Sequence, residues 1–453
     1  QMPLCDRDRT VAEPMTNELI GLLMVGAMLF AIFIGFPISF TLLFLGIVFG
    51  YWGFGELVFY LMTLTFNSTM MEQTLTSVPL FVFMGIMMEQ ANLMERLFDS
   101  IQKLLAKTRG SLFYAVMFVA TIFAAATGIV GASVTILGIM AGKPMIKSGY
   151  DVKLSAGLIA AGGTLGILIP PSVMLVVMGP VLEVPVPVLF AAAIVPGLLL
   201  ALVFTVYAIV RCWLDPSLGP PLPPELRPTY MRDVWGDLFA GLVPPTFLVV
   251  ASLGSIFMGW ATPTEGAACG AVGAVLLALA YGRLSMKVVF GSLMKTLEIT
   301  VMILFLVAAS NFFGSVFAKL GTPTMLTEYL LSLDLNRWVI LGLIIALIFV
   351  LGWPLEWVPI VLIVVPFLLP LITKLGFNLT WFGILVAVTL QTAWLSPPVA
   401  LSAYFLKGVV PEWELSDIYK GMMQFMVLQI LVVLLIMVFP LIALWLPRVM
   451  YGD

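Results

Sequence analysis

Two adjacent prolines, Pro170 and Pro171, interrupt an apolar run, and a second pair, Pro397 and Pro398, interrupts another. A proline pair removes two backbone donors and clashes with the preceding turn, so a continuous helix cannot pass through either position. The second pair follows the first by 227 positions. The motif Gly376-Phe-Asn378 follows Gly149-Tyr-Asp151 by the same interval. Long apolar segments broken at matching points of two halves are typical of binding sites inside a membrane.

Composition places the chain in a bilayer. Of 453 residues, 62% are hydrophobic and 10% are charged, and the mean hydropathy is +1.14. Soluble domains have about 45–50% apolar and about 25% charged residues. The chain has no histidine, and its three cysteines show neither metal-ligand spacing nor a disulfide framework. Without histidine no Ser/His/Asp arrangement exists, and no phosphate-binding loop is visible, so an enzyme is disfavoured. No basic patch suggests that the protein binds nucleic acid.

The first half is predicted as residues 17–210, after an N-terminal extension at 1–16 that we interpret as an upstream addition rather than a structured element. In order we expect spans at 19–36 and 38–53, an interfacial helix at 56–76, a re-entrant hairpin near 78–105, a span over 111–140 broken at 127–133, the Pro-Pro span 152–182 and a span at 188–210. An ordinary span with a turn at Asn92 is the alternative to the hairpin.

A proline-rich, semi-rigid linker at 211–237 precedes the second half, residues 238–453. There we expect spans at 238–259 and 261–281, a polar helix at 283–298, a hairpin near 299–331 with its tip at 310–314, a span over 339–371 broken at 352–356, the Pro-Pro span 381–408 and a last span at 418–446. Thr262-Pro-Thr-Glu265 is a helix-capping signal.

Five crossings in each half, an odd number, require the second half to be inserted upside down. The predicted fold is therefore an all-α polytopic membrane protein, an inverted repeat with about ten crossings and two re-entrant hairpins. If the N-terminus is outside, the loops that then face the inside contain more lysine and arginine than the loops that face the outside. This bias predicts that both termini are outside.

Oxygen-bearing residues at the breaks and tips are the candidate ligands of a hard cation such as Na⁺. They are Thr127, Gly128, Gly131, Ser133, Ser310, Asn311, Gly314, Gly352, Glu356 and Ser396. Glu356 is the sharpest of them, because a carboxylate within a span is rare; a position in a re-entrant turn at the water interface is its alternative. The glycines could equally serve helix packing. The candidate substrate contacts are Thr164, Ser172, Asn92 and Thr392.

At these residues the sequence resembles the large membrane (M) subunit of the tripartite ATP-independent periplasmic (TRAP) transporters. The matching stretches are Val78-Pro-Leu-Phe81 with Gly85, Thr127 to Gly138, Gly149 to Asp151 with Gly163 to Ser172, Thr262 to Glu265, and Thr392 to Pro398. The resemblance covers Met15 to the end of the chain. It implies a sodium-driven elevator in a bacterial inner membrane. It also implies a small four-helix membrane subunit (Q type) and a periplasmic substrate-binding protein (P type) as partners. At Glu356 the family usually has aspartate.

The favoured function is that of a subunit that imports a small organic anion, with Na⁺ as the coupling ion. Duplicated breaks with hydroxyl- and carboxylate-bearing tips support this interpretation. A membrane channel and a proton-coupled organic acid carrier remain alternatives. A channel would need a continuous polar stripe across several spans, and none is visible.

Overall fold

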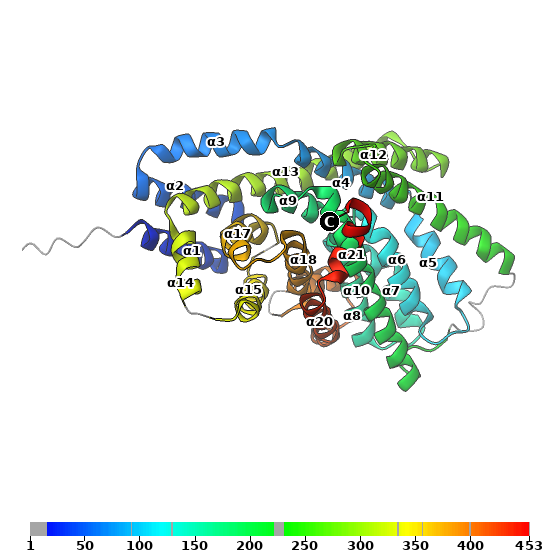
Figure 1. Cartoon of the computed structure of the whole chain (residues 1–453). Coiled ribbons are helices and arrows are strands. Elements are labelled where there is room, and N and C mark those ends of the chain that lie inside the picture. The colour runs from blue at the N-terminus through cyan, green and yellow to red at the C-terminus, as the bar shows by residue number, and fades with distance from the viewer. Residues whose placement is uncertain are drawn as a thin grey trace, which may run out of the picture.

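The computed structural model is all-helical over the residues that it describes, namely 16–91, 93–127, 130–221, 231–332, 335–355, 357–397 and 400–452 (Figure 1). Seven helices of this part of the chain are long and apolar enough to cross a bilayer, and the bent pair Leu57–Met71 and Gln73–Gln90 adds an eighth. Large apolar side chains such as Phe33, Phe44 and Phe247 are exposed on the outside. Such a surface is suited to lipid. The predicted all-α, polytopic fold is confirmed.

The first half runs from α1 to α10 and contains three interruptions of otherwise long helices. Its elements are α1 (Asn17–Ile34), α2 (Ile38–Phe54), α3 (Leu57–Met71), η1 (Gln73–Thr76), α4 (Ser77–Gln90), α5 (Leu93–Leu104), α6 (Ser111–Thr127), α7 (Val130–Lys147), α8 (Val152–Thr164), η2 (Leu165–Ile167), α9 (Val173–Leu182) and α10 (Val186–Leu214).

The second half repeats this order. Its elements are α11 (Met231–Phe257), α12 (Pro263–Ala280), α13 (Met286–Lys319), α14 (Thr322–Ser332), α15 (Arg337–Leu351), α16 (Trp357–Pro359), the π-helical η4 (Ile360–Val364), α17 (Val365–Lys374), α18 (Leu379–Leu395), α19 (Leu401–Val409), α20 (Leu415–Val438) and α21 (Leu441–Tyr451). Helices α8 and α18 begin 227 positions apart, the interval found in the sequence.

The same local signal starts α8 and α18. Gly149 and Gly376 have φ of +71° and +73°, the left-handed conformation that glycine adopts without strain and that ends the preceding helix. Two residues later, the side chains of Asp151 and Asn378 accept hydrogen bonds from amides in the first turn of α8 and α18, at 2.7 and 3.0 Å. The predicted cap at Thr262 is also present, as a reciprocal capping box with Glu265.

Each predicted proline break interrupts a helix. Helix α8 ends at Thr164, a short 3-10 turn follows, and α9 begins only at Val173, after Pro170 and Pro171. Ser172 holds this break together, because its hydroxyl donates to the carbonyl of Ile167 and accepts from an amide of α9. Helix α18 ends at Leu395 and α19 begins at Leu401. Residues 352–355, in the predicted break between α15 and α16, are also outside helices, whereas residues 128 and 129, between α6 and α7, lie outside the described part of the chain.

The predicted tip of the second hairpin was wrong. Residues 310–314 lie inside α13, a continuous helix of 34 residues, and the turn lies at Leu320 and Gly321 instead. Gly321 has φ of +81° and ends the helix there. The segment 310–314 contains no proline, and the side chain of Asn311 donates to Thr69 rather than to its own backbone, so nothing stops the helix. The first hairpin turns at Ala91, between α4 and α5; Asn92 lies outside the described residues.

Helix α13 also absorbs the separate polar helix predicted at 283–298. In the first half the corresponding elements remain distinct, since α3 and the helix that contains α4 meet at an angle of 55°. Pro79 occupies the first turn of α4, where its missing N–H is tolerated, whereas Leu306 stands at the equivalent point of α13 and lets the helix continue. We call α3 and residues 286–303 of α13 the two arms.

Two further boundaries differ from the prediction. The linker is shorter than 211–237, because α10 continues to Leu214 and α11 begins at Met231; residues 222–230 lie outside the described part. The last span is not continuous to 446. Helix α20 ends at Val438 and α21 starts after Pro440, whose missing N–H cannot continue the hydrogen-bond ladder.

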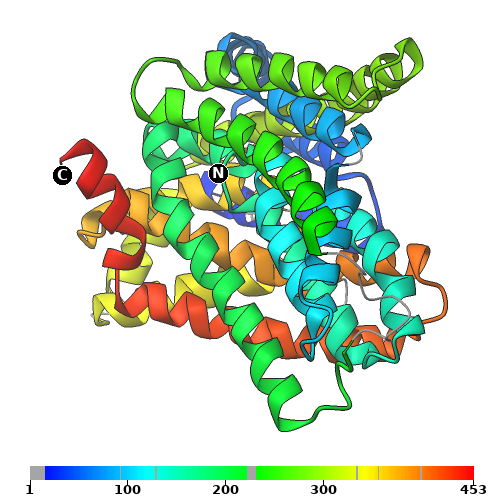
Figure 2. The same cartoon turned by 90° about the vertical axis from the view of Figure 1, so that its right-hand side faces the viewer.

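The packing of the helices follows the repeat. Helix α4 packs on α12 as α13 packs on α2, α5 on α11 as α14 on α1, and α8 on α20 as α18 on α10. Figure 1 shows α2, α3 and α13 running together along one side, and Figure 2 shows the long α10 and α20 in the view turned by 90°. Helices α8 and α20 approach each other closely, and Gly157 and Gly421 leave no room there for a side chain.

Candidate substrate and cation site

Three buried polar residues join the two halves at the centre of the molecule. The side-chain amide of Gln391 in α18 donates to the carbonyl oxygen of Thr164, the last residue of α8, at 3.0 Å. Gln429 of α20 donates in turn to the side-chain oxygen of Gln391, at 2.8 Å. Both glutamines are fully buried, and the side-chain oxygen of Gln429 has no hydrogen-bond partner among the described residues. Because Thr164 and Gln391 are 227 positions apart, their contact marks the pseudo-twofold axis of the repeat.

The predicted substrate contacts Thr164, Ser172 and Thr392 come together near this axis but are fully or almost fully buried. Their hydroxyls are used locally: that of Thr164 donates to the carbonyl of Ala161, and that of Thr392 to the carbonyl of Thr389. Ser172 bridges the first break as described above. A substrate would therefore reach these three residues only after neighbouring helices separate.

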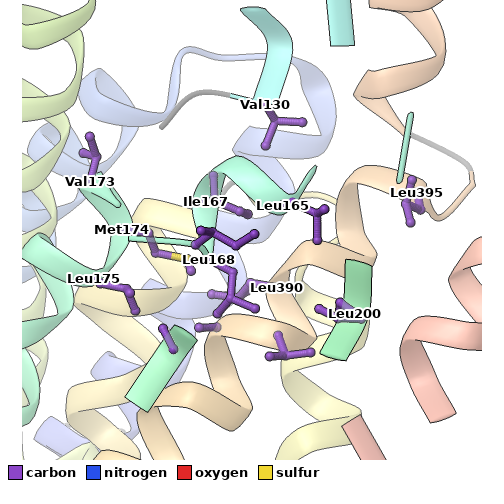
Figure 3. Close-up of a cluster of buried hydrophobic side chains, with 14 of the residues drawn as sticks. Val130, Leu165, Ile167, Leu168, Val173, Met174, Leu175, Leu200, Leu390 and Leu395 are labelled. Carbon is purple, nitrogen blue, oxygen red and sulfur yellow. The ribbon is translucent and has the colours of Figure 1, made fainter. Parts of the chain in front are cut away.

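Apolar side chains fill the space around the first break (Figure 3). Leu165 and Leu168 of the break lie beside Leu390 of α18 and Leu200 of α10, and each of the four is at most 1% exposed. Val130, at the start of α7, covers Ile167 from the other side. The centre of the molecule is thus a packed core, and open space lies elsewhere.

Of the cation ligands predicted in the first half, Gly131 and Ser133 lie in helix-packing contacts, and Gly131 also lines a cavity described below. Gly131 admits the ring of Phe405, since a Cβ there would lie 2.9 Å from the ring. Ser133 is buried, one residue before Val134, whose backbone nitrogen would lie 3.0 Å from a Cβ at Gly163. The first turns of α7 therefore pack against the end of α8. Gly128 and the side chain of Thr127 lie outside the described residues.

Among the cation ligands predicted in the second half, Ser310 is the one whose buried hydroxyl is left for a cation. Its side chain is fully buried and its hydroxyl has no hydrogen bond within the described structure. On the same helix, the Asn311 side chain donates to the hydroxyl of Thr69 in α3 at 3.1 Å. Gly314 lets α13 approach the η4 segment, because a Cβ there would lie 3.4 Å from the carbonyl oxygen of Leu362.

The remaining predicted ligands gather at the second pair of breaks. A Cβ on Gly352, just after α15, would lie 3.0 Å from Ala393 in the last turn of α18, so the two breaks touch. The hydroxyl of Ser396 donates to the carbonyl of Thr392 at 2.6 Å and contacts the sulfur of Met426. Glu356 lies outside the described residues.

A cavity of about 540 Å³, the Glu72 cavity, opens between arm α3, helix α9, the hairpin part of α13 and the segment 360–366. The polar residues that line it are Thr65, Ser68, Thr69, Glu72, Asn311 and Ser315. Glu72 is the one carboxylate among the described lining residues, which include no lysine or arginine. Its oxygen accepts from the amide and hydroxyl of Thr74, at 3.3 and 2.7 Å. Two predicted residues, Asn311 and Gly314, thus line open space.

A second cavity of about 370 Å³, the Lys295 cavity, lies between α4, α7, the arm of α13, and α19. It is the symmetry mate of the first. The walls of each cavity come from both halves. One half supplies an arm and the helix that follows its Pro-Pro break, and the other half supplies a hairpin helix and the helix that follows its earlier break. Lys295 stands 227 positions after Ser68, and Thr135 the same interval before Leu362. Equivalent surfaces therefore carry different charges.

Several of these residues were missed from the sequence. Gln391, Gln429, Glu72 and Lys295 were not among the predicted site residues. Two glutamines inside long apolar runs are a signal that could have been used, because amides buried in lipid-facing segments need partners. The positions of Glu72 and Lys295 relative to open space follow from helix packing and have no local signature.

Comparison with known structures shows first that the fold resembles one already solved. The chain matches the crystal structure of the Alcanivorax borkumensis YdaH transporter, reported to have an unusual topology, with a TM-score of 0.63, 15% identity, and coverage of 94% of this chain and 98% of that chain.

The family follows from the sequence. Residues 25–442 match the family model described as Tripartite ATP-independent periplasmic transporter, DctM component. The sialic acid TRAP transporter large permease protein SiaM of Vibrio cholerae is 30% identical over 93% of this chain and 97% of its own. The C4-dicarboxylate TRAP transporter large permease protein DctM of Pseudomonas aeruginosa is 29% identical over 83% of this chain and 86% of its own.

The chain therefore belongs to the DctM family, the large permease component of TRAP transporters. It is a multi-pass inner-membrane transport subunit and not an enzyme. Membership implies a periplasmic binding protein and a small membrane subunit as partners.

Proposed function

We propose that this subunit imports a small organic anion across the inner membrane, driven by a sodium gradient, after a periplasmic binding protein delivers the substrate. The observation that carries the proposal is the pair of related cavities, each built from both halves, on either side of the Thr164–Gln391 contact. A closed centre with a cavity at each related position is the arrangement that alternating access requires.

Sodium coupling is supported by oxygen atoms at the breaks and by Ser310, which lies inside the continuous helix α13. Na⁺ is a hard cation that suits hydroxyl and carbonyl oxygens, and broken helices in transporters supply these at mid-membrane. Ser310 offers a buried hydroxyl that lacks a partner, and an unsatisfied buried hydroxyl costs about 1–3 kcal/mol. A bound cation would remove that cost.

An organic anion is supported by the relatives. The named cargoes of the two permeases above, sialic acid and C4-dicarboxylates, both carry carboxylates. Lys295 supplies a positive charge at one cavity. From the lysine and arginine bias we propose that this cavity lies on the inner side with both chain termini outside, and that the hairpins make an elevator movement between the two sides.

Uptake into proteoliposomes tests the proposal directly. The chain is reconstituted with its small membrane partner and supplied with the binding protein, and accumulation of labelled substrate is followed with and without a sodium gradient. We expect accumulation only when sodium is present outside and the binding protein is added. Accumulation driven equally well by a proton gradient without sodium would favour the proton-coupled carrier, and currents far above carrier rates would favour a channel.

A further inference from the structure

The Lys295 cavity contains two opposite charges that do not touch. The Lys295 ammonium comes from the arm of α13, and the Glu89 carboxylate from hairpin helix α4. Within the described structure, however, neither side chain takes part in a salt bridge or a side-chain hydrogen bond. An ammonium and a carboxylate that face one cavity without closing on each other leave a site with a positive and a negative end.

The remaining lining residues define what fits between these ends. Thr135 donates its hydroxyl proton to the carbonyl of Gly131 at 2.7 Å, so its oxygen is left to accept a hydrogen bond. Glu89 and Thr135 thus give the cavity two groups that can accept a hydrogen bond from a ligand donor. Ile86, Ile136 and Phe405 line the rest of the cavity with apolar surface. A volume of about 370 Å³ is within the range of small-molecule sites.

The related Glu72 cavity provides a comparison within the same chain. Ser68 occupies the position of Lys295 there, and the described lining includes no cation. A carboxylate ligand would therefore be attracted to one of the two cavities and not to the other. The two cavities come from the same structural repeat, so their difference in charge is what distinguishes the ligand that each can bind.

From this geometry we propose that the Lys295 cavity binds the transported acid, with its carboxylate at Lys295 and a hydroxyl group donating to Glu89 and Thr135, which makes the substrate a hydroxyl-bearing carboxylic acid. The inference rests on the proposed transport of an organic anion and adds the substrate class. Because Lys295 belongs to an arm and Glu89 to a hairpin, the ligand bridges two elements that belong to different halves of the chain.

Binding measurements test this assignment without requiring transport. The full chain is purified with its small membrane partner, and ligand-induced thermal shifts are measured with three pairs of acids that differ in their hydroxyl groups: lactate and propionate, malate and succinate, gluconate and hexanoate. We expect the hydroxylated member of at least one pair to bind more tightly than its counterpart. Lys295→Met should weaken that binding about tenfold or more, and Lys295→Arg should retain most of it.

Glu89→Gln should reduce the preference for the hydroxylated acid while leaving binding of the deoxy acid nearly unchanged. Lys287→Met, on the same arm but not lining the cavity, is the matched control and should behave as the unmodified chain. Equal affinity within every pair, no binding by any of the six acids, or unchanged affinity in Lys295→Met would overturn the assignment. If sodium-driven uptake fails while these binding differences hold, the transport proposal fails and the site stands; if uptake succeeds while Lys295→Met binds normally, only the site falls.

Discussion

Thr164 and Gln391 occupy the same position in the two halves of the chain, and a 3.0 Å hydrogen bond joins the carbonyl of the first to the side-chain amide of the second. This hydrogen bond thus joins the two halves at their common axis. The two residues occupy equivalent positions of the repeat but are of different types. Gln391 can serve both halves because a glutamine has a donor for Thr164 and an acceptor for Gln429.

Replacing Gln391 by leucine should destabilise the protein by about 1–3 kcal/mol, because it removes the donor to the buried Thr164 carbonyl and leaves the Gln429 amide with only its 3.3 Å hydrogen bond to the carbonyl of Val388. Thermal unfolding in detergent measures the effect. The double variant Gln391→Leu/Gln429→Leu should recover part of the loss, since fewer buried polar groups then remain unpaired. Equal stability of the single variant and the unmodified chain would contradict the role of this contact.

Gly421→Ala should separate α20 from α8. A Cβ at this position would lie 2.0 Å from the carbonyl oxygen of Lys153, and backbone cannot move aside as a flexible side chain can. We expect a loss of about 1–3 kcal/mol or of folded protein, measured by unfolding and by monodisperse yield. Gly254→Ala in α11 is the control. A Cβ there meets nothing within 4 Å, so it should be neutral or stabilise by up to about 1 kcal/mol.

Ser310→Ala distinguishes a cation ligand from an idle hydroxyl. If Ser310 binds Na⁺, the sodium concentration for half-maximal uptake should rise about tenfold, the equivalent of ~1.4 kcal/mol. If it binds nothing, removing a buried hydroxyl without a partner should leave uptake unchanged and raise the melting temperature. Ser292→Ala on the same helix, another buried hydroxyl without a partner, should leave the sodium titration unaffected.

Glu356→Gln should also weaken the sodium dependence of uptake, because the sequence places a carboxylate inside a broken apolar segment. The measurement is a sodium titration of initial uptake rates beside the unmodified chain. Glu356→Asp, which keeps a carboxylate on a side chain one methylene shorter, should keep the dependence. An unchanged titration in the glutamine variant would remove Glu356 from the site.

Cross-linking tests whether the hairpin moves relative to the arm. The Asn311 side chain donates to Thr69 at 3.1 Å, so cysteines at these two positions face each other. In a background without the natural cysteines, a short thiol cross-linker should block uptake in the double variant, and reduction of a cleavable linker should restore it. Each single cysteine treated with the same reagent should stay active. Full uptake in the cross-linked protein would argue against relative movement of α3 and α13.

The breaks of the fold could be predicted because each has a local cause. Proline pairs, and the glycines at 149 and 376 followed by a capping side chain, act within a few residues. The tip of the second hairpin could not be placed in the same way. Polar residues around Asn311 resembled a turn, but Asn311 is satisfied by Thr69 from an element more than 200 positions away. Gly321 was the true signal and was overlooked.

The site was predicted in outline only. Hydroxyls at breaks were chosen as ligands, yet Thr164, Ser172 and Thr392 use theirs to hold local backbone. Whether a hydroxyl is free depends on backbone geometry that no spacing reveals. Open space likewise depends on how four helices from two halves diverge, which is why Glu72 and Lys295 escaped notice.

Each cavity described above draws its walls from both halves of the chain, so neither half alone encloses one. A half-length ancestor would have needed a second copy inserted in the opposite direction before it could hold any solute. Because both copies lie in one chain, equivalent positions such as Ser68 and Lys295 can carry different side chains, which a dimer of identical chains would not allow.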